Sequence, residues 1–437
     1  MLKLALLFSL AALAAFGQVV DLTILHFNDF HAKLLPTAGR GGAAHLVSAI
    51  EKERANCPRC VVLNAGDNVQ GSPVSTIYRG LPVFEVLRPA RVDAFALGNH
   101  EFDYGADRIN DFIAAAGHPV LAANFVTPEG RLFTEAGSVV LERDGLRIGI
   151  VGVLMEDLVP KLTTPAKLGN NRLLPALDVL RAEAARLRGQ TDILIALVHL
   201  WKEQCDQIVA EIPEYAVVVS GHDHGGMMKP FRFADRLGVR LRANGSELGR
   251  LDLRYDKAER KIVSSDWKIL PVGPATYPAH PETAAIVEKW ERKVKAVVDV
   301  PIGTSKRELK RDEVRAWIET IMRDTTKSDF VFMNSGGVRD TLPAGALEAR
   351  NLWNIMPFDN LLVTAKVKGA LIPPFIRKEQ EVDPEKLYSV STIDFLIESW
   401  RNGADPALRA FAQQMPLEGP LLRDAMLDWV RARKTVE

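Results

Sequence analysis

The sequence feature that most limits how this chain can fold is a series of short apolar runs. Polar residues follow most of these runs directly. The runs have the length of β-strands, and segments with the helical spacing of apolar residues separate several of them. Strands that alternate with helices favour a layered α/β architecture. The predicted strands cover residues 22–27, 61–64, 92–97, 120–124, 193–199 and 216–220.

The rest of the pattern predicts two domains joined by a helix. A stretch with several Pro and Gly residues closes the first region, and one long helix with a narrow apolar face follows it. The other predicted elements are helices over 43–54, 106–116 and 175–188 and hairpins over 138–154 and 250–270. The predicted boundaries are a first domain over 18–280, a connecting helix over 281–300 and a smaller α/β domain over 301–437.

Five junctions between a predicted strand and the loop after it carry polar clusters. Taken singly, such a cluster is more often a turn with a hydrogen-bonded histidine than a site. Together they hold five of the nine histidines, and ligand sites in open α/β sheets lie beyond the carboxyl ends of strands. This inventory of Asp, Asn and His suits two adjacent divalent cations with one Asp left to bridge them. The clusters are Asn28-Asp29-Phe30-His31, Gly66-Asp67-Asn68, Gly98-Asn99-His100-Glu101-Phe102-Asp103, His199 and Gly221-His222-Asp223-His224-Gly225.

These motifs carry a resemblance to a known family. The five clusters resemble the signature of calcineurin-like metallophosphoesterases. The segment Met333-Asn334-Ser335-Gly336-Gly337-Val338-Arg339, with Met356-Pro357-Phe358-Asp359-Asn360 after it, resembles the C-terminal domain of the bacterial 5′-nucleotidase family. That family also contains UDP-sugar hydrolases and 2′,3′-cyclic phosphodiesterases. The resemblance implies a four-layer α/β/β/α sandwich followed by a smaller α/β substrate-binding domain.

The resemblance also implies which residues hold two metal ions. Asp29, His31 and His224 match the ligands of one metal. Asn99, His199 and His222 match the ligands of the second, and Asp67 matches the bridging carboxylate. Two cations about 3.5–4 Å apart repel each other and need an anionic bridge between them. Imidazole mixed with oxygen ligands suits Zn, Mn or Fe better than an all-oxygen Mg or Ca site.

His100 and Asp103 are the remaining polar pair in the first domain. In the family, the matching His stabilises the transferring phosphoryl group or protonates the leaving oxygen, and the matching Asp orients the imidazole. The alternative for Asp103 is a helix N-cap for a helix over 104–116, since Asp suits that position. We expect a structural role for Glu101.

In the second domain, the resemblance implies a nucleoside site with a stacking ring and an arginine near the phosphate. Asn334, Gly336 and Arg339 match the family's Asn-Ser-Gly-Gly-x-Arg loop, and Phe358 matches the first stacking ring. A core aromatic is the alternative for Phe358.

The second domain also departs from the family. A β-rich segment that is usual in its middle is absent, and the later Gly-Gly-Asp-Gly-aromatic loop has no counterpart. The second stacking ring is therefore left open between Phe395 and Trp400.

The first 17 residues are typical of a signal peptide. Lys3 supplies the positive charge, residues 4–16 form an apolar core, and the small residues before Gln18 offer a cleavage site. The apolar run is shorter than the about 20 residues that span a bilayer, which favours export over an anchor. We expect an exported protein, periplasmic or extracellular, with no membrane span after cleavage.

The composition of the chain limits the kinds of partner that we expect it to bind. The 55 Lys and Arg residues equal the 55 Asp and Glu residues, whereas proteins that coat nucleic acid polymers need a surplus of basic charge. Three cysteines are too few for a disulfide scaffold. For Cys57 and Cys60, a small disulfide or two free thiols is favoured over redox or zinc chemistry, and Cys205 is expected to be unpaired.

The sequence thus predicts an exported phosphoesterase with two metal ions that releases phosphate from nucleotide monophosphates. Related hydrolyses of the same superfamily are the alternatives: a 2′,3′-cyclic phosphodiester, a UDP-sugar or a thiosulfate ester. A remote alternative is an inactive exported binding module.

Overall fold

The structure is a computed structural model that describes residues 19–378 and 380–436. The chain forms two compact units. The first unit comprises the residues up to Val69, Gly80–Glu156 and Gly169–Val287, and the second comprises Gln70–Arg79, Asp157–Leu168 and Glu288–Glu437. The division falls within helix α10 (Pro281–Val298), which occupies the position of the predicted connecting helix. The predicted signal peptide, residues 1–17, lies outside the described residues.

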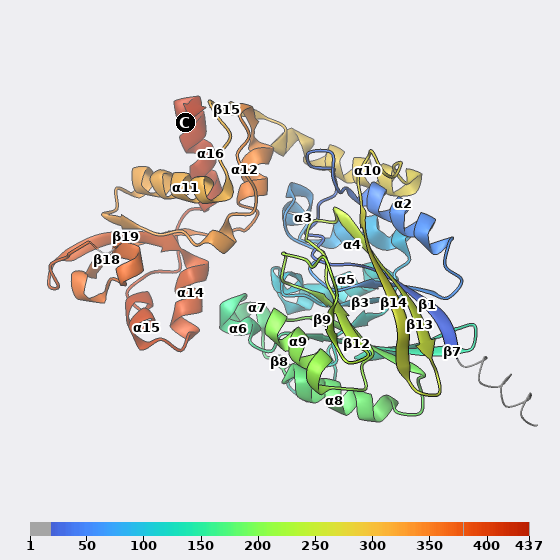
Figure 1. Cartoon of the computed structure of the whole chain (residues 1–437). Coiled ribbons are helices and arrows are strands. Elements are labelled where there is room, and N and C mark those ends of the chain that lie inside the picture. The colour runs from blue at the N-terminus through green and yellow to red at the C-terminus, as the bar shows by residue number, and fades with distance from the viewer. Residues whose placement is uncertain (1–18, 379, 437) are drawn as a thin grey trace, which may run out of the picture. The chain divides into compact units, whose positions relative to one another are not determined.

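Two six-stranded sheets form the centre of the first unit (Figure 1). Their inner faces share one apolar core, to which Ile24, Leu63, Ile195 and Val219 contribute. Parallel strands that are covered on both faces need continuous apolar runs, and such runs are what the sequence shows at these positions. In sheet order, the first sheet is β14 (Lys261–Pro271), β13 (Glu247–Asp256), β1 (Val19–Phe27), β2 (Cys60–Asn64), β3 (Ala94–Ala96) and β4 (Val120–Leu121). The second is β11 (Phe231–Phe233), β12 (Arg236–Val239), β10 (Val217–Gly221), β9 (Ile193–His199), β7 (Leu146–Leu154) and β6 (Ser138–Arg143).

Helices cover the outer faces of both sheets. Helix α2 packs against β1 and β13, α8 packs against β7, and α9 packs against β10 and β12. The unit therefore has helix, sheet, sheet and helix layers, and the predicted four-layer α/β/β/α sandwich is confirmed. The helices of this unit are α2 (Ala43–Arg54), α4 (Leu81–Leu87), η1 (Arg88–Ala90), η2 (His100–Phe102), α5 (Ala106–Ala116), α8 (Ala176–Leu187) and α9 (Lys202–Glu211), and a separate pair of short strands is β5 (Phe125–Val126) and β8 (Arg172–Leu173).

One local prediction was wrong, and the alternative role of Asp103 as a helix N-cap is excluded. Strands β3 and β4 are shorter than expected because the chain leaves the sheet early to form loops; in one of them the Asn124 side chain, rather than the backbone, pairs with the Leu154 backbone. Helix α5 begins at Ala106 with Gly105 as its N-cap, so Asp103 does not cap a helix. Its carboxylate instead accepts a hydrogen bond from His100.

The cysteines follow the interpretation that the sequence favoured. Cys57 and Cys60 form a disulfide, and Cys205 is free and buried on α9. Burial raises the pKa of the Cys205 thiol to about 12, so it stays protonated and unreactive at neutral pH.

The second unit is built on two three-stranded sheets with separate apolar cores. The first sheet is β17 (Gly345–Glu348), β15 (Pro301–Ser305) and β20 (Thr435–Val436), and the second is β16 (Phe330–Val331), β19 (Leu387–Ile393) and β18 (Leu362–Lys368). The helices are α3 (Pro73–Ile77), α6 (Leu158–Lys161), α7 (Pro165–Leu168), α11 (Arg311–Thr326), η3 (Ser335–Gly337), α12 (Ala349–Ile355), η4 (Gly369–Leu371), α13 (Pro374–Arg377), α14 (Asp394–Asn402), α15 (Pro406–Ala412) and α16 (Leu422–Arg433).

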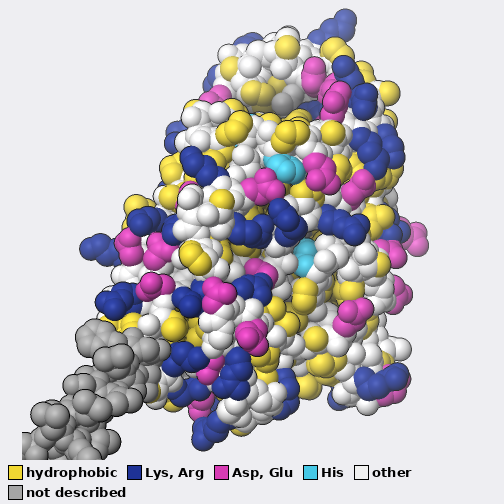
Figure 2. Space-filling view, turned by 90° about the vertical axis from the view of Figure 1, so that its right-hand side faces the viewer, with side chains coloured by type: hydrophobic (Ala, Val, Ile, Leu, Met, Phe, Trp, Pro, Cys, Tyr) yellow, Lys and Arg dark blue, Asp and Glu magenta, His cyan; other side chains and the backbone are white. Residues whose placement is uncertain are grey.

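The surface matches the balanced composition. Figure 2 shows Lys and Arg side chains interspersed with Asp and Glu side chains over the face drawn, so no field of one sign covers this face. Within the residues that the structure describes, no helix has both the length and the apolar character needed to cross a membrane.

Candidate metal centre

The polar clusters converge because strands β1, β2 and β3 run parallel in one sheet and β9 and β10 run parallel in the other. Parallel strands present their carboxyl ends at one edge of the sheet. Asp29, Asp67 and Asn99 follow β1, β2 and β3 within three residues. His199 is the last residue of β9, and His222 follows β10 directly. The facing sheets thus bring both sets of loops to the same place.

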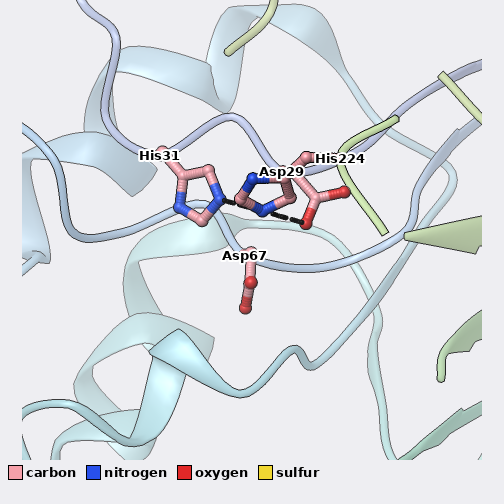
Figure 3. Close-up of side chains that lie close together, drawn as sticks. All are labelled: Asp29, His31, Asp67 and His224. Atoms are coloured by element: carbon pink, nitrogen blue, oxygen red, sulfur yellow. Dashed lines mark hydrogen bonds and ion pairs between the residues drawn. The ribbon is translucent and has the colours of Figure 1, made fainter. Parts of the chain in front are cut away.

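One group of side chains contains Asp29, His31, Asp67 and His224, whose potential ligand atoms all lie within 4.8 Å of one another (Figure 3). The Nε2 atoms of His31 and His224 are 3.0 Å apart, and His224 Nε2 is 3.4 Å from Asp29 Oδ1. Two ring nitrogens that face each other at this distance need a proton or a cation between them. The donor set therefore fits a metal ion.

A second group contains Asp67, His199 and His222, with the same limit of 4.8 Å. His199 Nε2 lies 3.1 Å from Asp67 Oδ2. Asn99 joins this group, because its Oδ1 lies 3.2 Å from His199 Nε2 and 3.0 Å from His222 Nδ1. Asp67 belongs to both groups. The structure thus brings together all seven side chains that the sequence singled out, with the shared carboxylate at the expected residue.

A backbone contact sets the tautomer of His199. Its Nδ1 lies 2.7 Å from the carbonyl oxygen of Ala65, which can only accept, so Nδ1 carries the proton. The lone pair of Nε2 is then directed at Asp67 and Asn99. A histidine whose other nitrogen is held by a carbonyl is the usual arrangement of a metal ligand.

The buried charges favour a cation at this place. Burial alone would raise the pKa of Asp67, but His199, His100 and His31 hold it well below its ordinary value. Burial alone would lower the pKa of His199, but the carboxylates of Asp67 and Asp29 raise it to about 9. Without a metal, a proton on His199 neutralises these carboxylates. A divalent cation would compete with that proton for the lone pair on His199 Nε2.

The loops hold several of these residues in an unfavourable backbone conformation. Asp29, His31, Asp67 and His222 all have positive φ angles, between 48° and 79°. Such residues cluster at functional sites and persist where the surroundings hold them. Here the loops after β1 and β2 hold each other: the backbone N–H groups of Asp29 and His31 donate to the carbonyls of Gly66 and Asp67 at 2.9 and 3.0 Å.

Two glycines permit the close approach of the loops. A Cβ atom at Gly66 would lie 2.4 Å from His199 Nδ1, and one at Gly98 would lie 2.2 Å from Asp67 Oδ1. Side-chain atoms at either position would displace a candidate ligand.

His100 and Asp103 form a pair beside the two groups. His100 Nδ1 lies 2.8 Å from Asp103 Oδ2, and both side chains are mostly buried. The backbone N–H of His100 donates to Asp67 Oδ1 at 2.8 Å, and its ring centroid lies 5.1 Å from that of His31. The imidazole is therefore held in one tautomer next to the candidate ligands.

Glu101 connects the loops after β2 and β3. It is completely buried, and its carboxylate accepts hydrogen bonds from the backbone N–H groups of Gly98, Asp67 and Asn68 at 2.7, 3.1 and 2.8 Å. Burial and the charge of Asp67 raise its pKa to about 7, although these N–H donors oppose the rise.

Asn28 is a positioning residue that the sequence pattern did not predict. Its amide donates to Asp29 Oδ2 at 2.6 Å and exchanges two hydrogen bonds with the Leu241 backbone at 3.1 Å each. It thereby ties the loop after β1 to the second sheet. The only signal in the sequence was its place in the Asn28–His31 cluster.

The residues singled out in the second unit lie in two neighbouring loops of that unit. Arg339 lies with its guanidinium carbon 6.0 Å from the centre of the Phe358 ring, and its backbone N–H donates to the Ile355 carbonyl at 2.9 Å. Phe358 is half-buried, and Gly336 is exposed. Asn334 Oδ1 is buried and has no hydrogen-bond partner among the described residues.

The two candidates for a second stacking ring are both engaged elsewhere. Trp400 belongs to an aromatic cluster with Phe332 and Phe375, at centroid distances of 6.1 and 5.8 Å. Phe395 packs against the apolar core that lies under α11 and α16.

The fold and the centre together define a class. Two facing sheets whose strand ends gather Asp, Asn and His side chains around a shared carboxylate are compatible with a metal-dependent phosphoesterase that binds two metal ions.

Two family models match parts of this chain. A family model described as calcineurin-like phosphoesterase matches residues 22–226, and one described as 5′-nucleotidase, C-terminal domain, matches residues 294–378. The chain is thus similar to calcineurin-like phosphoesterases over the first of these ranges and to the C-terminal domain of 5′-nucleotidases over the second.

Similar proteins cover most of the chain. Protein UshA of Escherichia coli is 26% identical over 459 residues, which cover 88% of this chain and 81% of that protein. Endonuclease YhcR of Bacillus subtilis is 25% identical over 393 residues, but the match spans 80% of this chain and only 32% of that longer protein. The solved structure of a 5′-nucleotidase precursor from Thermus thermophilus has a TM-score of 0.84 at 22% identity, over 96% of this chain and 97% of that chain. At this identity the likeness shows the fold.

Replacement of Glu101 by Gln is expected to weaken metal binding. The amide NH₂ group would face backbone N–H donors, so the loops that carry Asp67 and Asn99 would separate. Loss of such a supporting contact lowers metal affinity about 10–100-fold. Metal content of the purified protein, measured by mass spectrometry after dialysis against graded chelator, checks this. Glu203→Gln on the exposed face of α9 is the matched control. Equal retention of metal by the two variants would contradict the role of Glu101.

Proposed function

We propose that this protein hydrolyses nucleotide monophosphate esters to a nucleoside and inorganic phosphate. The observation that carries the proposal is the pair of ligand groups that share Asp67, with the His100–Asp103 pair beside them. A two-metal centre with a histidine held by a carboxylate beside it suits displacement at a phosphate ester, because it can stabilise both the attacking and the leaving oxygen.

In this proposal, Asp29, His31, Asp67 and His224 hold one divalent cation, and Asp67, Asn99, His199 and His222 hold the other. The facing nitrogens of His31 and His224 and the single tautomer of His199 fit such ions. Bound cations would supply positive charge that polarises a phosphate ester and lowers the pKa of water to about 7. Imidazole and oxygen donors favour Zn, Mn or Fe.

The chain's own groups complete the chemistry. Asp103 holds the proton of His100 on Nδ1, which leaves Nε2 to contact the substrate. In its protonated form, the His100 ring stabilises negative charge on the phosphoryl group or gives its Nε2 proton to the leaving oxygen. When that oxygen departs with the proton, the products are a neutral nucleoside hydroxyl and phosphate.

The second unit supplies the proposed nucleoside site. Phe358 is half-buried, which leaves part of its ring for stacking, and base stacking on aromatic rings contributes about 1–3 kcal/mol per base in proteins that bind nucleic acids. Arg339 beside it offers a guanidinium fork for phosphate or sugar oxygens. The orphaned Asn334 Oδ1 is an acceptor that a ligand hydroxyl or amino group would satisfy.

Other substrates of the superfamily are the competing proposals. A 2′,3′-cyclic phosphodiester, a UDP-sugar and a thiosulfate ester would use the same metal centre and differ only in what the second unit binds. An inactive binding module is the remote alternative, and the complete ligand set argues against it.

We further propose that the protein is exported to the periplasm or the extracellular space. Lys3, the apolar core over 4–16 and the small residues before Gln18 support this, and the Cys57–Cys60 disulfide suits an oxidising compartment. Cell fractionation followed by mass spectrometry of the intact protein is expected to find a mature chain that begins at Gln18. A chain that keeps its first 17 residues in the cytoplasmic fraction would contradict export.

A substrate panel tests the proposed reaction. We expect phosphate release from AMP in the presence of Mn or Zn to exceed release from UDP-glucose, a 2′,3′-cyclic nucleotide, thiosulfate esters and an aryl phosphate. Asp67→Asn removes the shared anion, so release from every substrate is expected to fall about a hundredfold or more. Unchanged release in this variant would refute the metal mechanism, and a silent wild type across all metals and substrates would favour the binding module.

Replacement of Asp103 by Asn tests the role of His100. The amide carries no negative charge to hold a proton on the imidazole, so kcat is expected to drop about 10–100-fold. Steady-state kinetics with AMP measure kcat. Asp111→Asn, an exposed carboxylate on α5, serves as the control. If Asp103→Asn keeps the wild-type kcat, His100 does not act as an acid through Asp103.

A further inference from the structure

The loop that carries Phe358 has little structure of its own. It spans residues 356–361, between the end of α12 at Ile355 and the start of β18 at Leu362, and it belongs to no helix or named strand. The carbonyls of its first three residues are instead held by side chains from elsewhere in the second unit. The conformation of the Phe358 ring therefore depends on the groups that bind this loop.

The main group is Arg423, the second residue of the C-terminal helix α16. Its side chain is only 3% exposed. One guanidinium nitrogen, Nη1, donates to the carbonyls of Met356 and Phe358 at 3.0 and 3.1 Å, and Nη2 donates to Asp359 Oδ1 at 2.6 Å. A single planar fork thus holds the backbone on both sides of Pro357 and the side chain that follows Phe358.

The fork itself packs on an aromatic ring. The guanidinium carbon of Arg423 lies 3.7 Å from the centre of the Trp353 ring, which belongs to α12. The carbonyl between those of Met356 and Phe358, that of Pro357, accepts a hydrogen bond from Thr76 Oγ1 at 3.0 Å. The three successive carbonyls from Met356 to Phe358 are therefore all bound by buried side chains.

We propose that Arg423 is a positioning residue that sets the conformation of the Phe358 loop and thereby the affinity for the nucleoside. This inference rests on the proposed function, because it assigns Phe358 to the base. Arg423 does not contact the substrate. It acts by keeping the ring in place before the base arrives, so that binding does not have to order the loop.

The chain offers a matched control on the same helix. Arg433, near the other end of α16, lies over Trp429 with its guanidinium carbon 3.8 Å from the ring centre and pairs with Asp324 at 2.7 Å. It has the same combination of ring and carboxylate as Arg423 but does not bind the Phe358 loop. Replacement of Arg433 therefore tests loss of an arginine from α16 without the proposed effect.

The experiment compares Arg423→Lys with Arg433→Lys on two substrates, AMP and glycerol phosphate, which has no ring to stack. Lysine keeps the charge but cannot reach two carbonyls and a carboxylate at once. For Arg423→Lys, we expect the ratio of kcat/KM for AMP to that for glycerol phosphate to fall about tenfold, through KM for AMP rather than kcat. Adenosine should inhibit glycerol phosphate hydrolysis about tenfold more weakly. For Arg433→Lys, the ratio should stay at the wild-type value.

The outcomes separate the two proposals. A wild type that shows no preference for AMP over glycerol phosphate overturns the proposed nucleotide specificity and this inference with it. A wild type that prefers AMP, with the same ratio and adenosine inhibition in Arg423→Lys, overturns the inference alone. An equal loss on both substrates also overturns it, because that is what a purely structural residue would cause. If Arg423→Lys does not fold, Asp359→Ala decides: its exposed carboxylate is one of the three acceptors, and a rise of about threefold in KM for AMP is expected.

Discussion

A carboxylate that is buried between two groups of histidines is the constraint on which the rest of the site depends. Asp67 is almost inaccessible to water, and a charge in that position needs nearby positive charge or hydrogen-bond donors. His199 and His100 supply part of the positive charge and part of the hydrogen bonding. Glu101 places a second buried carboxylate close to Asp67. The accumulated negative charge is what makes the place suitable for divalent cations.

The sandwich provides the frame that this arrangement needs. Four of the candidate ligands, Asp29, His31, Asp67 and His222, have positive φ angles on short loops. The loops after β1 and β2 bind each other through backbone hydrogen bonds and follow directly on strands, which holds this conformation. Gly66 and Gly98 allow the loops to approach to distances that a side chain would forbid. Most of the candidate ligands thus lie in loops, and the strands of the two sheets hold these loops in position.

Substrate selection is separable from this chemistry. The metal centre lies in the first unit, whereas the candidate base-stacking ring lies in the second, on a loop held by Arg423 and Thr76. The second unit shows no strand between Lys368 and Leu387 within its described residues, and this is where the chain departs from the family pattern. Because the overall charge is balanced, an anionic substrate of the kind proposed would be attracted by bound cations and a few placed arginines rather than by the net charge of the surface.

The sequence alone indicated the layered architecture and the polar clusters at the strand ends, because continuous apolar runs of strand length followed by polar residues are local signals. The choice of seven candidate ligands within those clusters came from the resemblance to calcineurin-like metallophosphoesterases. Local signals could not decide between a helix cap and a partner of His100 for Asp103, since Asp suits both. The tertiary structure showed that Asp103 pairs with His100, and it showed which groups Asn28, Glu101 and Arg423 hold. Their hydrogen-bond partners lie on other loops, up to 213 residues away for Asn28 and 67 for Arg423, so their roles exist only once the chain has folded.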